Sequence, residues 1–154
     1  MSVNSNHPLN LLLRSRRCES LLPQRQNAIL IDSYTSQTDG ATIYIDFQSL
    51  ARLNEIEALM RDLASGKSNC FALSELAGTY WLPPIREILL SISKSGLLVS
   101  TEQDGADLVC HWSGTAEDWL DSADKVRELA RGPGHQYFED RNLENPTVKL
   151  AYLE

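Results

Sequence analysis

A short pattern occurs twice in this chain of 154 residues, and it limits the folds that the chain can adopt. Asp39-Gly40-Ala41 recurs as Asp104-Gly105-Ala106, an offset of 65 residues, and each copy precedes a run of strand-forming residues that ends in an aromatic. A second set recurs with an offset of 66 residues, where Arg61, Leu63, Ala64 and Gly66 correspond to Arg127, Leu129, Ala130 and Gly132. The sequence therefore predicts two tandem units of similar structure.

The first unit reads as strand, strand, helix, strand, strand. A glycine-containing turn joins "AILIDSYTS" to "ATIYIDF", which predicts a hairpin. A helix that ends at Gly66 is predicted by apolar residues at helical spacing, namely Leu53, Ile56, Leu59, Met60 and Leu63. "NCFALSEL" and "IREILLSIS" read as strands, and "AGTYWLPP" between them reads as a loop, because Pro83 and Pro84 cannot serve a central ladder.

The second unit repeats this order. A turn at Asp104-Gly105 joins "LLVSTEQDG" to "ADLVCHW". Thr115 is a good N-cap for a helix that ends at Gly132-Pro133, with acidic residues in its first turn. Its predicted apolar face comprises Ala116, Trp119, Leu120, Ala123, Val126 and Ala130. "HQYFED" and "TVKLAYLE" read as the last two strands.

A unit of about 60 residues with one helix would be marginal alone, so the two units are expected to share one core. The predicted fold is α+β: two strand–strand–helix–strand–strand repeats joined in one pseudo-symmetric domain, with a mixed, largely antiparallel sheet and two main helices. Residues 27–96 form the first repeat and residues 97–154 the second. Residues 1–26 form a polar, basic extension outside the core.

Charge and cysteine content exclude several classes of function. The net charge is −7, and residues 95–154 carry twelve acidic and five basic side chains, so this half would repel a nucleic acid. Three widely spaced cysteines form no disulfide framework and fit a reducing compartment. "LNLLL" is too short for a signal peptide, and no run is long enough to span a membrane. A cytoplasmic location is expected.

The neighbours Cys110 and His111 do not form a catalytic pair, because successive strand residues point to opposite faces. Leu108, Cys110 and Trp112 share an apolar face, so Cys110 is predicted to be a small buried hydrophobe. His111 and His135 are expected on parallel strands but far apart, which argues against a metal site. No phosphate-binding or nucleophile motif occurs, so neither a cofactor nor catalytic residues are predicted.

The remaining candidates are contacts for a protein partner. Tyr80 and Trp81 are aromatic anchors or pack at the junction of the units, and sequence reasoning leaves both readings open. Acidic residues of the second helix form either a solvated surface or a docking face for a basic partner. The complete set of candidate contacts is Tyr80, Trp81, His111, Glu117, Asp118, Asp121, Asp124, His135, Glu139 and Asp140. An exposed edge strand would also allow a homodimer.

The second repeat resembles the small α+β immunity proteins that protect bacteria from polymorphic and contact-delivered toxins. The residues that carry the resemblance are "LVCHWSGTAEDWLDSADKVRELA", "GHQYFED" and "TVKLAYLE", and it extends more weakly over Ile43 to Ile92. The first repeat departs from the pattern, with Asn69 in place of the histidine. The resemblance implies a non-catalytic protein that binds a cognate toxin and blocks its active site.

Three hypotheses follow. The first is an immunity protein whose acidic and aromatic surface occludes a toxin, and the charge suits a basic, nuclease-like toxin. The second is a duplicated regulatory module that binds a small molecule at the junction of its repeats, with Tyr80 and Trp81 lining it. The third is an enzyme in which His135 and a nearby carboxylate act as acid and base.

Overall fold

The computed structural model describes residues 28–37, 40–139 and 145–154. Within these residues, the two α-helices each follow a pair of strands. The elements are β1 (Ile29–Ser36), β2 (Gly40–Phe47), α2 (Leu50–Ser65), β3 (Cys70–Ala72), the short 3-10 helix η2 (Leu73–Glu75), β4 (Thr79–Trp81), β5 (Ile85–Ile92), β6 (Leu98–Asp104), β7 (Asp107–Gly114), α3 (Ala116–Leu129), β8 (Gly134–Phe138) and β9 (Thr147–Tyr152).

The strands form two sheets. Sheet A has the order β4-β1-β2-β9-β8, and sheet B has the order β3-β5-β7-β6. β2 pairs with β9 in parallel, as do β1 with β4 and β5 with β7, whereas the other neighbours are antiparallel. Sheet A therefore combines the β1–β2 hairpin with the last two strands and with β4 at its edge, and sheet B combines the β6–β7 hairpin with β3 and β5.

The α+β class with two main helices is confirmed, but the prediction of one sheet is wrong. The closing strands of each half cross over to pair with the hairpin of the other half. Two smaller sheets can both turn an apolar face toward the same pair of helices, which one long twisted sheet could not do. β4 also forms inside the predicted loop, and it ends at Trp81, before Pro83 and Pro84.

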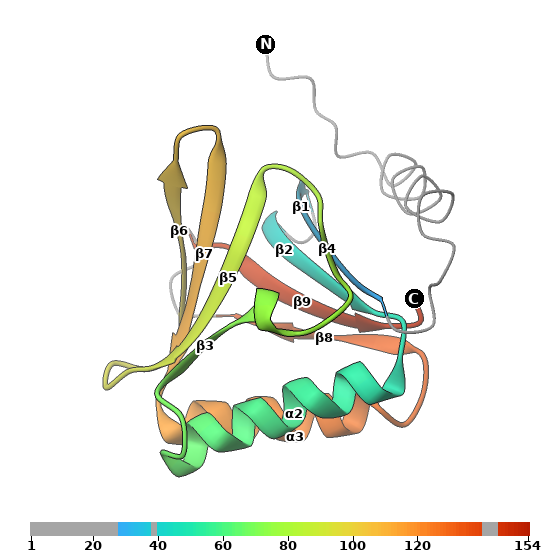
Figure 1. Cartoon of the computed structure of the whole chain (residues 1–154), viewed down its shortest axis with the longest axis vertical. Coiled ribbons are helices and arrows are strands. Elements are labelled where there is room, and N and C mark those ends of the chain that lie inside the picture. The colour runs from blue at the N-terminus through green and yellow to red at the C-terminus, as the bar shows by residue number, and fades with distance from the viewer. Residues whose placement is uncertain (1–27, 38–39, 140–144) are drawn as a thin grey trace.

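Helices α2 and α3 pack against each other and lie along the bottom of the molecule in Figure 1. α2 contacts β2 and β5, while α3 contacts β7, β8 and β9. The predicted face of α2 is confirmed, because Leu53, Ile56, Met60 and Leu63 are buried. Gly66 ends α2 with φ of 78°, a left-handed conformation in which its N–H donates to Leu63 O.

Helix α3 begins with the predicted cap. The Thr115 hydroxyl accepts from Asp118 N, and Asp118 Oδ2 accepts from Thr115 N, so each residue satisfies a backbone donor of the other. Trp119, Ala123 and Val126 are buried as predicted, whereas Ala116 and Leu120 are exposed and Ser122 takes a buried position instead.

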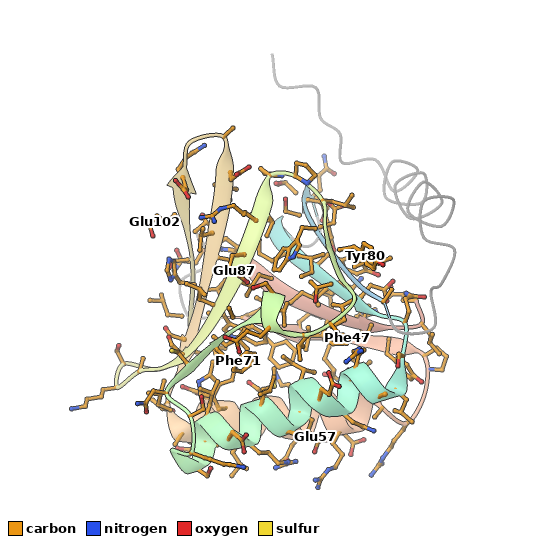
Figure 2. The ribbon with its side chains drawn as sticks, in the orientation of Figure 1. Phe47, Glu57, Phe71, Tyr80, Glu87 and Glu102 are labelled. Atoms are coloured by element: carbon orange, nitrogen blue, oxygen red, sulfur yellow. The ribbon has the colours of Figure 1, made fainter. Side chains whose placement is uncertain are left out.

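One core lies between the two sheets and the helices. It joins residues of both sheets to both helices, among them Phe47 of β2 and Phe71 of β3 (Figure 2). Trp112 of β7 is its aromatic centre: its ring lies 5.2 Å from that of Trp119 and 5.1 Å from that of Phe138. Phe138 belongs to sheet A and Trp112 to sheet B, so this aromatic cluster ties the two sheets together.

Candidate functional site

One side of sheet A faces away from the core, and we call it the sheet A face. Most of the buried polar and charged side chains of the described residues lie on it. It arises because alternate residues of each strand point away from the core. Ile43, Ile45 and Phe47 of β2 enter the core, which turns Tyr44 and Asp46 to the opposite side. The residues of the sheet A face used below are Leu30, Asp32, Tyr44, Asp46, Tyr80, His135, Tyr137, Lys149 and Ala151, together with Glu154 beyond β9.

Strand register places four of these residues in one row across the sheet. Asp32 pairs with Tyr44, Tyr44 with Lys149, and Lys149 with Tyr137. Directly paired side chains of neighbouring strands lie within contact distance of each other. The row therefore brings a carboxylate, two phenols and an ammonium together from two pairs of strands that are far apart in sequence.

Lys149 is the centre of this row. Only 8% of its side chain is exposed, and its ammonium lies between two rings, with Nζ 5.5 Å from the centroid of Tyr44 and 5.7 Å from that of Tyr137. Such cation–π contacts are attractive, and more so when water is excluded. Nζ also donates to Glu154 Oε1 at 3.2 Å, which gives the buried charge a partner.

Glu154 binds His135 as well as Lys149. Its Oε2 lies 2.8 Å from His135 Nδ1, and the His135 ring packs edge-on against Tyr137. Leu153 has a φ of 52°, which is uncommon for a bulky residue, and its N–H donates to Phe47 O. The turn at Leu153 brings the carboxylate of Glu154 back over β8 and β9.

Tyr44 stays protonated in this setting. Burial raises its pKa far above the ordinary value, and the charges of Asp46 and Glu154 raise it further. Its hydroxyl is thus a permanent hydrogen-bond donor. Asp46 is itself buried and accepts from Gln48 Nε2 at 2.5 Å.

A second row crosses all five strands of sheet A. Tyr80 pairs with Leu30, Leu30 with Asp46, Asp46 with Ala151, and Ala151 with His135. Two of the sequence-predicted contacts, Tyr80 and His135, thus lie at opposite edges of one face. Tyr80 is 45% exposed at the β4 edge (Figure 2). Its neighbour Trp81 is half-buried and packs against the core, so the two aromatics have different roles.

His111 lies on the other sheet, away from this face. Its Nε2 is 3.0 Å from Glu102 Oε2 of β6, on the outer side of sheet B (Figure 2 labels Glu102). The prediction of parallel strands for His111 and His135 is wrong, because β7 belongs to sheet B and β8 to sheet A. The rule of right-handed crossovers applies only within one sheet.

Cys110 is fully buried, as the sequence predicted. Burial raises the pKa of its thiol to about 12, so it remains a neutral thiol at ordinary pH. It packs in the core beside Trp112, with no access for a substrate.

The predicted acidic face of α3 is divided among different tasks. Glu117 and Asp121 are exposed, as is Glu139 just after β8. Asp118, however, caps the helix, and Asp124 Oδ1 accepts from Arg61 Nη2 of α2 at 2.8 Å. The remaining candidate, Asp140, lies outside the described residues, as does the extension of residues 1–26.

No group of three or more metal-ligating side chains occurs in residues 28–37, 40–139 and 145–154. Over the same residues, neither helix has the length and apolar character that a membrane crossing requires.

Sequence reasoning missed Tyr44, Tyr137, Lys149 and Glu154. Alternation in "ATIYIDF" and "TVKLAYLE" does indicate which residues point away from the core. It does not indicate that β2 pairs with β9, so the meeting of Tyr44 and Lys149 could not be inferred.

The sheet A face therefore emerges from pairing between distant strands rather than from any local motif. In the comparisons with known proteins, no protein family, no curated protein and no solved structure matches the chain.

Proposed function

We propose that this chain is a non-enzymatic immunity protein that binds and neutralises a cognate bacterial toxin, and that the sheet A face is its docking surface. The observation that carries the proposal is the row from Tyr80 to His135. Within this row Tyr80 and His135 are exposed at the two edges of the sheet, whereas Leu30, Asp46 and Ala151 between them are buried, so the direct contacts would be made at the edges.

The chemistry of the face supports a basic partner. Tyr80 and His135 are exposed at its two edges, where they can contact another protein. Glu154, which binds His135, adds a partly exposed carboxylate, and the chain as a whole has a net charge of −7. A negative field speeds association with a positively charged cleft.

The acidic residues of α3 support a docking role less well. Asp118 and Asp124 already bind partners within the chain, and α3 also carries Lys125 and Arg127. A helix surface of mixed charge is the ordinary solvated kind. We therefore assign docking to the sheet A face in preference to α3.

The test compares the two surfaces on an identified toxin. A tagged chain is used to capture partners from its native host, and a captured protein qualifies only if it is toxic alone and harmless with this chain. We expect the double variant Tyr80→Ala/His135→Ala to lose binding at least about a hundred-fold, because interface anchors contribute 2 kcal/mol or more each. The matched control Glu117→Gln/Asp121→Gln, on α3, should bind as the wild type does.

Loss of binding in the control alone would move the docking surface to α3 while leaving the toxin-binding function in place. If no captured protein is both toxic alone and harmless with this chain, the function itself is rejected.

We further propose that residues 27–96 and 97–154 are tandem repeats of one ancestral unit. The sheet orders support this, because β1-β2-β9-β8 and β6-β7-β5-β3 follow one scheme, a hairpin whose second strand pairs in parallel with the last strand of the other half. Arg61 and Arg127, matched by the sequence offset, both bind Glu57 on α2. A circular permutant that begins at residue 97 and ends at residue 96 should keep the fold if the halves are equivalent.

A further inference from the structure

We infer that Lys149 and His135 form a binding site for the carboxylate group of a small acid, and that Glu154 fills this site from within the chain. The two donors approach one carboxylate from neighbouring strands. Lys149 Nζ lies 3.2 Å from Oε1 of Glu154, and His135 Nδ1 lies 2.8 Å from Oε2. Each oxygen thus has its own donor, which is how proteins hold a carboxylate in a fixed orientation.

The donors are held in place before any ligand arrives. Lys149 and His135 belong to the paired strands β9 and β8, and the Tyr44 and Tyr137 rings flank the lysine. An oriented pair of donors on paired strands makes a binding site because little freedom remains to be lost when a ligand binds. Such rigidity is more than an ion pair on a surface requires.

The acceptor is held less firmly than the donors. Glu154 lies outside the sheet, beyond β9, and reaches the donors through Leu153 in a left-handed conformation that bulky residues avoid. The side chains of Glu154 and His135 are 37% and 38% exposed, whereas that of Lys149 is 8% exposed. Solvent therefore reaches the carboxylate, and a ligand that displaces it would find both donors in place.

The present occupant indicates the ligand class. Lys149 Nζ and His135 Nδ1 each meet a different oxygen of one planar carboxylate, and the Tyr44 and Tyr137 rings contact the ammonium. Two donors spaced for the two oxygens of one carboxylate match a small carboxylic acid, which is the ligand class that we assign.

The experiment removes the internal competitor and supplies an external one. Acetate and benzoate are titrated into the wild-type chain, into Glu154→Ala and into Glu154→Ala/Lys149→Met, with chloride at equal ionic strength and phosphate as references. Binding is read from NMR shifts of the His135 imidazole and of the backbone amides of β8 and β9, whose spectra also report whether each variant is folded.

We expect Glu154→Ala to bind the carboxylates at least about ten-fold more tightly than the wild type, because the internal occupant lowers the fraction of open sites. Lys149→Met should abolish this gain, and chloride and phosphate should not reproduce the shifts. If Lys149→Met prevents folding, His135→Gln in the Glu154→Ala background takes its place and should weaken binding.

Equal affinity of the wild type and Glu154→Ala would overturn the inference, as would an absence of carboxylate binding to both. Binding that persists without the lysine or histidine donor, or that chloride or phosphate matches, would overturn it too. No toxin enters this experiment, so its result does not depend on the docking function proposed above.

Discussion

At the scale of single residues, the buried thiol of Cys110 makes the stability of the protein depend on alkaline pH. Burial raises its pKa from 9.0 to about 12 in the folded chain. Below pH 9.0 the thiol keeps its proton in both states, and stability is unaffected. Above it, only the unfolded chain loses the proton, so the free energy of unfolding falls by about 1.4 kcal/mol per pH unit until the folded thiol also ionises.

The variant Cys110→Ala tests this dependence. It should be less stable than the wild type at neutral pH by about 1 kcal/mol, because a small cavity replaces the sulfur. Its free energy of unfolding in urea should fall less steeply than that of the wild type between about pH 9 and about pH 10. Tyr44→Phe is the control. Burial raises the Tyr44 pKa as well, but the free energy of unfolding depends on this phenol only above its ordinary pKa of 10.0, so Tyr44→Phe should keep the wild-type slope between about pH 9 and about pH 10. An unchanged slope in Cys110→Ala would contradict the assignment to this thiol.

Single residues differ in how far the sequence predicts them. The burial of Cys110 follows from alternation within one strand, and the cap at Thr115 follows from residues three apart. The contact between Lys149 and Tyr44 requires knowledge that β9 lies beside β2. No local pattern encodes that neighbour relation, so the central residues of the candidate site were not predictable.

At the scale of elements, the start of α3 depends on the reciprocal bonds between Thr115 and Asp118. Thr115→Ala should lower the free energy of unfolding by about 1 to 2 kcal/mol, because it leaves a helix N–H without its acceptor. Thr115→Ser retains the hydroxyl and should lose only a small part of this. Urea unfolding of the three proteins measures the difference, and an equal loss in both variants would show that the methyl group matters rather than the cap.

The pairing of the two helices depends on Glu57 (Figure 2). Its Oε1 accepts from Arg61 Nε at 3.0 Å within α2 and from Arg127 Nε of α3 at 3.0 Å. Only 14% of the Glu57 side chain is exposed. Removal of its charge therefore leaves two guanidinium groups beside a largely buried position without the charge of their shared acceptor. Glu57→Gln should therefore lower the free energy of unfolding by about 1 kcal/mol or more.

Glu55 supplies the matched control for this helix pair. Its ion pair is with Arg52 within α2 and the Glu55 side chain is 44% exposed, so Glu55→Gln should change stability by less than about 0.5 kcal/mol. Comparable losses in the Glu55 and Glu57 variants would mean that the contact between the helices contributes little.

At the scale of the whole molecule, neither half of the chain contains a complete sheet. Sheet A needs β1 and β2 from the first half and β8 and β9 from the second, and sheet B is divided in the same way. Residues 1–96 and 97–154, expressed separately, should each lack cooperative unfolding, because each leaves an apolar hairpin without its neighbours. An equimolar mixture should regain the dispersed NMR spectrum of the intact chain. Cooperative unfolding of residues 97–154 alone would contradict this.

The overall arrangement was predictable only in part. Periodicity predicted two helices and most strands, since each depends on a few neighbouring residues. The exchange of closing strands between the halves was missed, because a repeat pattern suggests that each unit completes its own sheet. The choice depends on the parallel pairing of β5 with β7 and of β2 with β9, which is a property of the folded molecule.

The position of β9 inside sheet A has a consequence for synthesis on the ribosome. Ile43 of β2 pairs with Val148, which is added 105 residues later, whereas Ile88 of β5 waits only 22 residues for Cys110. At about 5 to 20 residues per second, the apolar edge of β2 stays unpaired for roughly 5 to 20 s as the nascent chain grows. Sheet B closes first, and the β1–β2 hairpin is the segment that a chaperone would have to shield until translation reaches β9.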